Sequence, residues 1–423
     1  MVCSHKAMIG YLSLIDASKC VEILWKELEL QDCFPDESIK KYERVLESKW
    51  TCVTKLNAQI AKLVVEKARL ESELLSPSTA ITRPTQDPNK WLPSTPTYTL
   101  ESHREAITCI AFHPVHSSLA SGSEDCTIKI WDWEFGELER TLKGHSQTVT
   151  DLDFGGQKDK ILLASSSDDL KIKIWDPSND YANIRTLAGH DLPVTSVRFL
   201  KFGENRLVSA SRDASIRIWN VTMGYCIKTI YSHGDWIYGL SPSVNGELLV
   251  TGGRDQAATI WDVASGQAKA LVRGHDHHIE CCAFAPAASY QSLAAMSGVK
   301  VSSSPGKNTD AEFVATGGRD KTVKLWNIRG RLIKTLVGHD SWVQDLVFHP
   351  GGRYLLSVGD DCTVRCWDLS QDARLVMTDE QTHRRFVSCI RWVPNLEAQD
   401  GAATGLRCVV ATGGRDSCVR IFK

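Results

Sequence analysis

The chain has 423 residues, of which 42% are hydrophobic and 24% charged, and its formal net charge is −2. This length and apolar content predict a large buried core, while the balanced charge excludes an overall field that would attract nucleic acid or an acidic membrane. No apolar run is long enough to cross a bilayer, and the N-terminus lacks a signal-peptide core, so we expect no membrane span and no signal peptide. The 14 cysteines have no disulfide or zinc spacing, which is typical of reduced thiols in a soluble intracellular protein.

The first 75 residues carry helical patterns. Residues 7–30 predict two short helices whose apolar side chains include Ile9, Leu12 and Leu24, and residues 40–50 continue the pattern. A heptad spacing then predicts a short parallel coiled coil with the core positions Val53, Leu56, Ile60, Leu63, Leu70 and Leu74. We therefore expect a homodimer built from a helical dimerisation motif (residues 1–40) and a helix with coiled coil (residues 41–75). The alternative is a single amphipathic helix that docks on the rest of the chain.

A linker follows the helices. Residues 76–96 contain five prolines and several serines and threonines, a composition typical of a semi-rigid spacer. From residue 97 to residue 423 the pattern changes to short alternating strands, so we expect a separate β domain there.

Seven repeats fill this β domain. In each, a Ser or Thr precedes an Asp by four residues, and an aromatic residue follows that Asp by six. The aspartates are Asp125, Asp169, Asp213, Asp255, Asp320, Asp361 and Asp416. The aromatic residues are Trp131, Trp175, Trp219, Trp261, Trp326, Trp367 and Phe422. Repeats of this length indicate four-stranded blades, so the sequence predicts an all-β, seven-bladed β-propeller.

A histidine precedes each of these aspartates. The seven are His103, His145, His190, His233, His275, His339 and His383. Together the Ser or Thr, His, Asp and Trp resemble the tetrad of WD-repeat proteins, in which each buried polar group finds a hydrogen-bond partner. The alternative is a Ser–His–Asp hydrolase triad. Seven copies of a triad make no catalytic sense and the GxSxG motif is missing, so we interpret the tetrads as structural.

The last repeat lacks its outer strand. We expect residues 97–102 to supply it, because joining the first and last segments leaves the ring without free sheet edges. Two repeats carry insertions, residues 286–311 and 394–407, which are rich in small and polar residues. We expect solvent-exposed loops there, with contacts to a partner as the alternative.

The turns that hold the tetrad aspartates carry a further pattern. The residue before the aspartate is an arginine in four repeats: Arg212, Arg254, Arg319 and Arg415. An aromatic residue stands three positions after the histidine in three repeats: Trp236, Trp342 and Phe386. Such a composition is typical of protein-binding hot spots, and Arg binds carboxylates through two hydrogen bonds. We predict that these seven residues bind a protein partner. The alternative is that they pair with neighbouring repeats or fill gaps between them.

Several segments resemble one family, that of the lissencephaly protein, also called nuclear distribution protein NudF. The most specific matches are the LisH-like residues Ile9, Tyr11, Leu12 and Glu27, and the segments KKYERVLESKW (40–50), WLP (91–93) and WDWEFGELERT (131–141). The resemblance extends over essentially the whole chain.

This resemblance implies a LisH motif, a short coiled coil and a WD-repeat propeller that binds partners without catalysis. It implies a homodimeric regulator of cytoplasmic dynein whose propeller binds the motor domain, with a NudE-type coiled-coil adaptor as a further partner. It also implies a location in the cytoplasm, on microtubules and at the spindle pole, and roles in nuclear migration and spindle positioning. Arg212, Arg319 and Trp342 match positions that contact dynein in the family, whereas Tyr238 and Cys362 replace an Arg and a Lys.

Other functions stay open from the residues alone. A LisH–WD scaffold could serve another complex, as a ubiquitin-ligase receptor or as the non-catalytic subunit of an acetylhydrolase. We do not expect an enzyme, because the sequence has no Gly-rich phosphate loop, no metal-ligand cluster and no nucleophile elbow. We accordingly expect no cofactor and no metal.

Overall fold

A computed structural model of the chain describes residues 95–157, 160–200, 205–231, 233–298, 312–380, 382–394 and 408–423. Contacts divide the chain between residues 84 and 85. The predicted helical motif, the coiled coil and all nine predicted dimerisation residues, from Ile9 to Leu74, lie outside the described residues, so they stay predictions.

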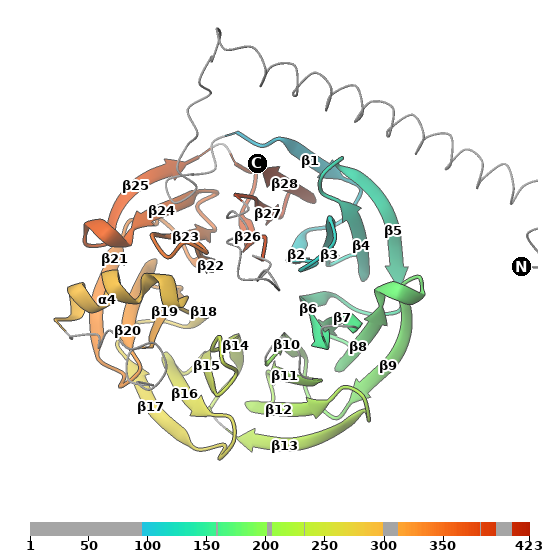
Figure 1. Cartoon of the computed structure of the whole chain (residues 1–423), viewed down its shortest axis with the longest axis horizontal. Helices are drawn as coiled ribbons and strands as arrows, with labels where there is room; N and C mark the ends of the chain where they lie inside the picture. The colour runs from blue at the N-terminus through green and yellow to red at the C-terminus, as the bar shows by residue number, and fades with distance from the viewer. Residues whose placement is uncertain are drawn as a thin grey trace, which may run out of the picture. The chain divides into compact units, whose positions relative to one another are not determined.

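Seven antiparallel four-stranded sheets form blades around a common centre, as Figure 1 shows. Blades 1 to 6 each contain four consecutive strands, ordered from the centre outwards. Blade 1 contains β2 (Ile107–Phe112), β3 (Ser118–Ser123), β4 (Thr127–Asp132) and β5 (Glu137–Lys143). Blade 2 contains β6 (Val149–Gln157), β7 (Lys160–Ser167), β8 (Lys171–Asp176) and β9 (Ala182–Ala188). Blade 3 contains β10 (Val194–Phe199), β11 (Arg206–Ser211), β12 (Ser215–Asn220) and β13 (Tyr225–Tyr231).

The remaining blades repeat this order. Blade 4 contains β14 (Ile237–Pro242), β15 (Leu248–Gly253), β16 (Ala257–Asp262) and β17 (Ala268–Arg273). Blade 5 contains β18 (Ile279–Phe284), β19 (Phe313–Gly318), β20 (Thr322–Asn327) and β21 (Leu332–Val337). Blade 6 contains β22 (Val343–Phe348), β23 (Tyr354–Gly359), β24 (Val364–Asp368) and β25 (Arg374–Asp379). Blade 7 contains β26 (Val387–Trp392), β27 (Val410–Gly414), β28 (Cys418–Phe422) and, as its outer strand, β1 (Tyr98–Glu101). The predicted seven-bladed propeller is confirmed.

Blade 7 closes the ring with strands from both ends of the propeller. In it β1 runs antiparallel to β28, with Tyr98 opposite Ile421 and Leu100 opposite Val419. The predicted outer strand from residues 97–102 is therefore confirmed, and Figure 1 shows β1 beside β28 at the junction with blade 1. This pairing matters because an unpaired β28 would expose its backbone groups.

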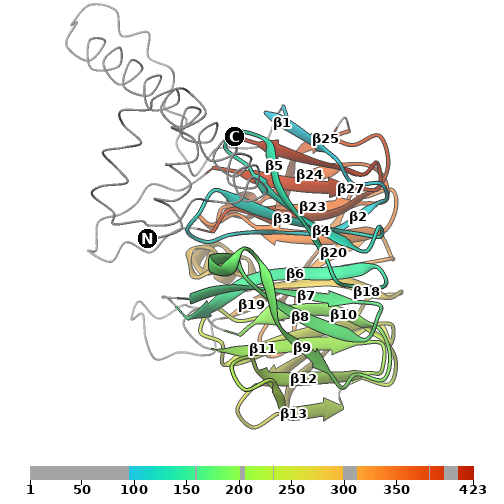
Figure 2. The ribbon, with the colours of Figure 1, turned by 90° about the vertical axis from the view of Figure 1, so that its right-hand side faces the viewer.

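The core lies between neighbouring blades, whose stacked sheets are visible from the side in Figure 2. In β4, Ile128 and Ile130 are buried and pack in one cluster with Leu152 and Phe154 of β6 in the next blade. Successive side chains of a strand point to opposite faces of its sheet, and a neighbouring blade covers each of these two faces. This explains why β3, whose sequence is SLASGS, is buried along its whole length.

The first insertion is partly helical rather than a solvent loop. Residues Ala287–Ser289 form the 3₁₀ turn η3, and Tyr290–Ser297 form α4, whose Leu293 and Ala294 are buried in the core of blades 5 and 6. The expectation of a loop is wrong for this part, because its apolar residues recur at helical spacing and cover the blade. The rest of this insertion and nearly all of the second lie outside the described residues.

Two further short 3₁₀ turns, η2 (Pro177–Asn179) and η5 (Leu369–Gln371), follow the third strands of blades 2 and 6. Within the described ranges, no helix has the length and apolar character needed to cross a membrane.

Candidate functional site

The tetrads form buried hydrogen-bond networks. In blade 3, His190 Nδ1 lies 2.8 Å from Asp213 Oδ2, His190 Nε2 lies 2.7 Å from Ser209 Oγ, and Trp219 Nε1 donates to the same Oγ at 2.8 Å. Blades 1, 2, 4, 5 and 6 repeat this network. Blade 7 keeps the His383–Asp416 and His383–Thr412 bonds, while Phe422 replaces the indole.

Each tetrad aspartate also shapes the turn between the second and third strands of its blade. Burial opposes ionisation of Asp125, but hydrogen bonds from Thr127 and His103 lower its pKa to about 2. The next residue, Cys126, has a φ of 64°, and the equivalent residue of every other blade also has a positive φ. The tetrads therefore act structurally, by fixing these left-handed turns against the histidine loops.

The two loops of each blade are joined by one backbone bond. The N–H of the residue before the aspartate donates to the carbonyl of the third residue after the histidine. In blade 4 Arg254 donates to Trp236 at 2.8 Å, and in blade 7 Arg415 donates to Phe386 at 2.8 Å. The predicted arginines and aromatic residues therefore do lie on one face of the propeller, which we call the loop face.

Trp236 lies between two arginines of the loop face. The guanidinium carbons of Arg212 and Arg254 lie 5.0 and 4.9 Å from the ring centre, within cation–π range. Carboxylates approach the same arginines: Asp168 at 4.0 Å from Arg212 and Asp235 at 3.6 Å from Arg254. These arginines thus have acidic neighbours, as the alternative to partner binding expects, and their side chains still reach solvent. Binding of a protein partner stays a prediction.

Arg319 is held from three sides. Its guanidinium carbon lies 4.2 Å from the Trp342 ring centre and 5.7 Å from that of Tyr238, and Glu280 forms an ion pair with it. Trp342 is 39% exposed, a large fraction for an indole held in place in this way. Burial raises the pKa of Glu280, and the hydrogen bond with Arg319 acts in the opposite direction by lowering it.

Tyr238 connects the two groups, because its ring lies edge-on to that of Trp236 at 6.4 Å between centroids. Trp236, Arg212, Arg254, Tyr238, Arg319 and Trp342 thus form one continuous chain of side chains over blades 3 to 6, which we call the Arg–aromatic chain. Arg415 and Phe386 form a separate pair on blade 7, at 5.8 Å. Of the two positions that the resemblance marks as departures, Tyr238 belongs to the Arg–aromatic chain, and Cys362 occupies a left-handed turn with a φ of 64°.

Glu280, which supports Arg319, was not predicted from the sequence. Glu280 is the fifth residue after its tetrad histidine, where every inner strand has a register shift. At this position the hydroxyls of Thr150 and Thr195 donate to a backbone carbonyl in the inner strand of the next blade, at 2.6 and 2.7 Å. The hydroxyls of Thr108 and Ser388 form the same hydrogen bond. Aligning the repeats shows the signal, because Tyr238, Glu280 and Gln344 replace the Ser or Thr in blades 4 to 6.

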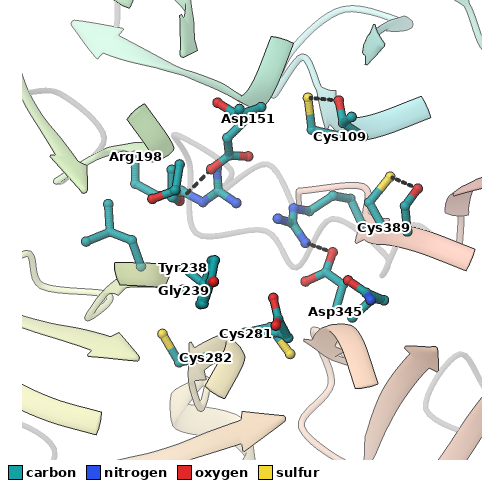
Figure 3. Close-up of a pocket in the computed structure, with 18 residues that line it drawn as sticks. Cys109, Asp151, Arg198, Tyr238, Gly239, Cys281, Cys282, Asp345 and Cys389 are labelled. Atoms are coloured by element: carbon teal, nitrogen blue, oxygen red, sulfur yellow. Dashed lines mark hydrogen bonds and ion pairs between the residues drawn. The ribbon is translucent and has the colours of Figure 1, made fainter. Parts of the chain in front are cut away.

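A cavity of about 120 Å³ lies at the centre of the ring, lined by the inner strands. Figure 3 shows Arg198 pointing toward Asp151, and a second ion pair joins Arg391 to Asp345. Each pair links inner strands of neighbouring blades and so supports the ring. Four cysteines line the same cavity.

Burial disfavours the nucleophilic thiolate form of these four cysteines. Burial raises the pKa of Cys282 and Cys389 to about 12, and raises that of Cys109 and Cys281 well above the ordinary range. Across the residues that the structure describes, no group of three His, Cys, Asp or Glu side chains is placed to hold a metal.

Comparisons with known proteins agree with this architecture. A family model described as "WD domain, G-beta repeat" matches residues 94–132, 136–176, 182–220, 224–262, 266–327 and 330–368. The nuclear distribution protein nudF of Aspergillus niger is 56% identical over 432 residues, which covers 99% of this chain and 97% of that protein. The nuclear distribution protein PAC1-1 of Uncinocarpus reesii is 59% identical over 434 residues with the same coverage.

The chain belongs to the nuclear distribution protein nudF/PAC1 family. A third member, nudF of Emericella nidulans, is 56% identical over 432 residues. The nudF/PAC1 alignments cover 99% of the chain and so extend into the residues before 94, where the WD-repeat matches begin. The resemblance noted from the sequence is confirmed, and a WD-repeat propeller in a nudF/PAC1 protein points to a non-catalytic scaffold.

Proposed function

We propose that the chain is a homodimeric, non-catalytic regulator of cytoplasmic dynein. Its loop face binds the motor domain and promotes the active, microtubule-engaged state in nuclear migration and spindle positioning. A NudE-type coiled-coil adaptor is a further partner, and the protein works in the cytoplasm, on microtubules and at the spindle pole. Membership in a family whose members are named nuclear distribution proteins supports the process.

The Arg–aromatic chain is the observation that carries the proposal. It places three guanidinium groups and two indoles on one face, and Trp342 remains 39% exposed. Ring contacts hold the guanidinium groups in place before binding, so less side-chain entropy is lost on contact with a partner. Arg and Trp are also the residues that most often dominate binding energy at protein interfaces.

The same geometry indicates the kind of surface that fits. A guanidinium group binds a carboxylate through two parallel hydrogen bonds, and the neighbouring rings cover the apolar part of the contact. An acidic helical surface with apolar residues between its carboxylates meets both requirements. Tyr238 contributes a ring instead of the charge usual in the family, so the electrostatic part of the contact rests on Arg212, Arg254 and Arg319.

The first test is binding of the purified chain to a dynein motor domain. Replacing Arg319→Ala together with Trp342→Ala should weaken binding at least tenfold, about 1.4 kcal/mol or more. The matched control is Arg374→Ala with Val376→Ala, which removes an arginine and an exposed apolar side chain from the outer strand β25. Both variants should melt at the wild-type temperature. Wild-type affinity in the first variant, or equal losses in both, would show that the Arg–aromatic chain is not the contact.

A further inference from the structure

The loop face changes its charge from one side of the ring to the other. The two residues after each tetrad histidine include an aspartate in blades 3 to 6: Asp191, Asp235, Asp276 and Asp340. In blade 7 the same positions hold Arg384 and Arg385, and in blade 1 they hold Arg104 and Glu105. The acidic loops place a carboxylate near an arginine, as in the 3.6 Å contact of Asp235 with Arg254 and the 3.1 Å contact of Asp340 with Arg365. Blade 7 places two cations there instead, and blade 1 places one cation next to Glu105.

The cations of blades 7 and 1 line two adjoining hollows. The first, of about 710 Å³, is lined by four arginines and two carboxylates: Arg384, Arg385, Arg415, Arg420, Glu101 and Asp416. The second, of about 290 Å³, is lined by Arg104, Lys129, Lys143 and one carboxylate, Asp125. The segment Glu101–Arg104 runs from the first hollow into the second, so the hollows follow one another across the junction of blades 7 and 1.

The tetrad carboxylates in these hollows are already occupied. Asp416 accepts hydrogen bonds from His383, from the Arg420 guanidinium group at 3.0 Å and from the Arg384 backbone N–H at 3.2 Å. Asp125 accepts from His103, from Thr127 and from the Arg104 backbone N–H. They therefore have little capacity left to neutralise the exposed arginines.

Three arginines of the first hollow keep their charge available. Among the described residues, Arg384, Arg385 and Arg415 form no ion pair with a carboxylate, and all three are exposed. Arg319 differs, because Glu280 occupies one side of its guanidinium group. The backbone bonds of Arg384 to Asp416 and of Arg415 to Phe386 hold two of these arginines in rigid loops. Such positions favour binding because the loops need no further ordering.

We propose that these cations form a second interaction surface, the basic arc, which binds an extended acidic peptide segment. The basic arc consists of five exposed cations: Arg104, Lys143, Arg384, Arg385 and Arg415. An anionic side chain of the peptide occupies each hollow, and its backbone crosses the junction of blades 7 and 1. The two hollows are lined by different residues, and an extended peptide can supply an anionic side chain to each, because it places a side chain on one face about every 7 Å.

The chemistry of the arc favours a peptide with several anionic side chains in succession. Arg binds both carboxylates and phosphates through two hydrogen bonds, so glutamate-rich and phosphoserine-containing segments share the required chemistry. Because the chain as a whole carries a net charge of −2, attraction is confined to this arc rather than spread over the molecule. The arc lies apart from the Arg–aromatic chain of blades 3 to 6, so the two surfaces can be tested separately.

The test uses the full chain and labelled peptides. Fluorescence anisotropy should detect binding of an oligoglutamate peptide but not of a length-matched oligoglutamine peptide, and rising salt should weaken the binding. Arg384→Gln with Arg385→Gln should reduce affinity at least tenfold, about 1.4 kcal/mol. The conservative variant Arg384→Lys with Arg385→Lys should retain most of the affinity, because it keeps the charge. Thermal melting checks that each variant folds.

Two controls separate this site from general charge effects. Lys269→Gln with Arg273→Gln removes two exposed cations from β17, on blade 4, and should leave peptide binding unchanged. Arg319→Ala with Trp342→Ala should also leave it unchanged, so failure of the dynein proposal would not affect this result. An equal loss in the β17 variant, or no binding of any acidic peptide at low salt, would overturn the basic arc. Binding of a phosphoserine peptide in place of oligoglutamate would support the arc and identify phosphate as its ligand group. Preferential binding of a short RNA, lost in the Arg384 and Arg385 variant, would overturn the peptide assignment.

Discussion

Ser209 shows how one hydroxyl connects three parts of a blade. Its Oγ accepts from Trp219 Nε1 at 2.8 Å and lies 2.7 Å from His190 Nε2, and all three side chains are buried. Because the Nδ1–H of His190 donates to the Asp213 carboxylate, Nε2 requires a donor, which the hydroxyl provides. This hydroxyl of the second strand thus satisfies one group of the third strand and one group of the preceding loop.

Ser209→Ala should therefore destabilise the propeller by more than a surface substitution. It leaves the Trp219 and His190 nitrogens buried without a partner, and each such group costs about 1–3 kcal/mol, so we expect a loss of about 2–6 kcal/mol. Urea unfolding followed by tryptophan fluorescence measures this loss.

The matched control is Ser209→Thr, because Thr251, Thr316 and Thr412 occupy the equivalent position in blades 4, 5 and 7. This variant should stay within about 1 kcal/mol of wild type, since it keeps the hydroxyl. Equal destabilisation by the two substitutions would mean that packing, rather than the hydrogen bonds, explains the effect.

At the scale of elements, β1 and β28 join the ring. Four residue pairs align β1 with β28, and Leu100, Val419 and Ile421 are buried in the cluster that blade 7 shares with blade 1. In this sheet β1 pairs only with β28, and no strand other than β1 pairs with the outer edge of β28. Closure therefore depends on two segments that lie at opposite ends of the propeller sequence.

Deletion of residues 414–423 should unfold the propeller rather than shorten it. The deletion removes β28, leaves β1 without a partner and exposes the blade 7 cluster to water. We expect loss of the cooperative thermal transition measured by circular dichroism at a β-sheet wavelength.

The control for this deletion is removal of Lys423 alone, which lies after β28 and is exposed. It should shift the melting temperature by no more than a few degrees. A cooperative transition in the longer deletion would show that the ring does not need its joining strand.

At the scale of the whole molecule, the proposed dimer would present two loop faces to a two-headed motor. Linking two binding modules raises the overall affinity through effective concentration, without any new contact. The predicted heptad positions Leu56 and Ile60 lie outside the described residues, so their role is a prediction from the sequence.

Leu56→Asp with Ile60→Asp should convert the dimer into a monomer. Charged side chains at core positions of a coiled coil remain buried without partners, which disfavours association. Light scattering should give half the wild-type mass, while the melting temperature of the propeller should not change. Binding to a dimeric motor should weaken more than binding to a single motor domain.

The control is Lys55→Asp with Lys62→Asp, which changes positions outside the predicted core. This variant should remain dimeric. If the Leu56 and Ile60 variant also keeps the dimer mass, the dimer does not use this coiled coil, and the alternative of a single docked helix gains support.

Much of the fold was predictable because its determinants repeat locally. The Ser or Thr, the Asp and the aromatic residue of each tetrad lie within eleven consecutive positions, and their hydrogen bonds recur in each blade. The blade number and the closing strand follow from counting these units. Helix α4 was missed because small residues dominated the composition of its segment, although Leu293 and Ala294 had the spacing to cover a blade.

The sequence by itself determined the propeller, its seven blades, the structural nature of the tetrads and the residue types on the loop face. Only the tertiary structure decided which of those residues meet. Arg319 of blade 5 lies over Trp342 of blade 6. Glu280, which forms an ion pair with Arg319, stands at a register shift that arises only when the strands pair. The basic arc likewise joins Arg104 to Arg384, which stand 280 positions apart in the sequence. Contacts of this kind depend on the angle between blades and on ring closure, which no local pattern of residues specifies.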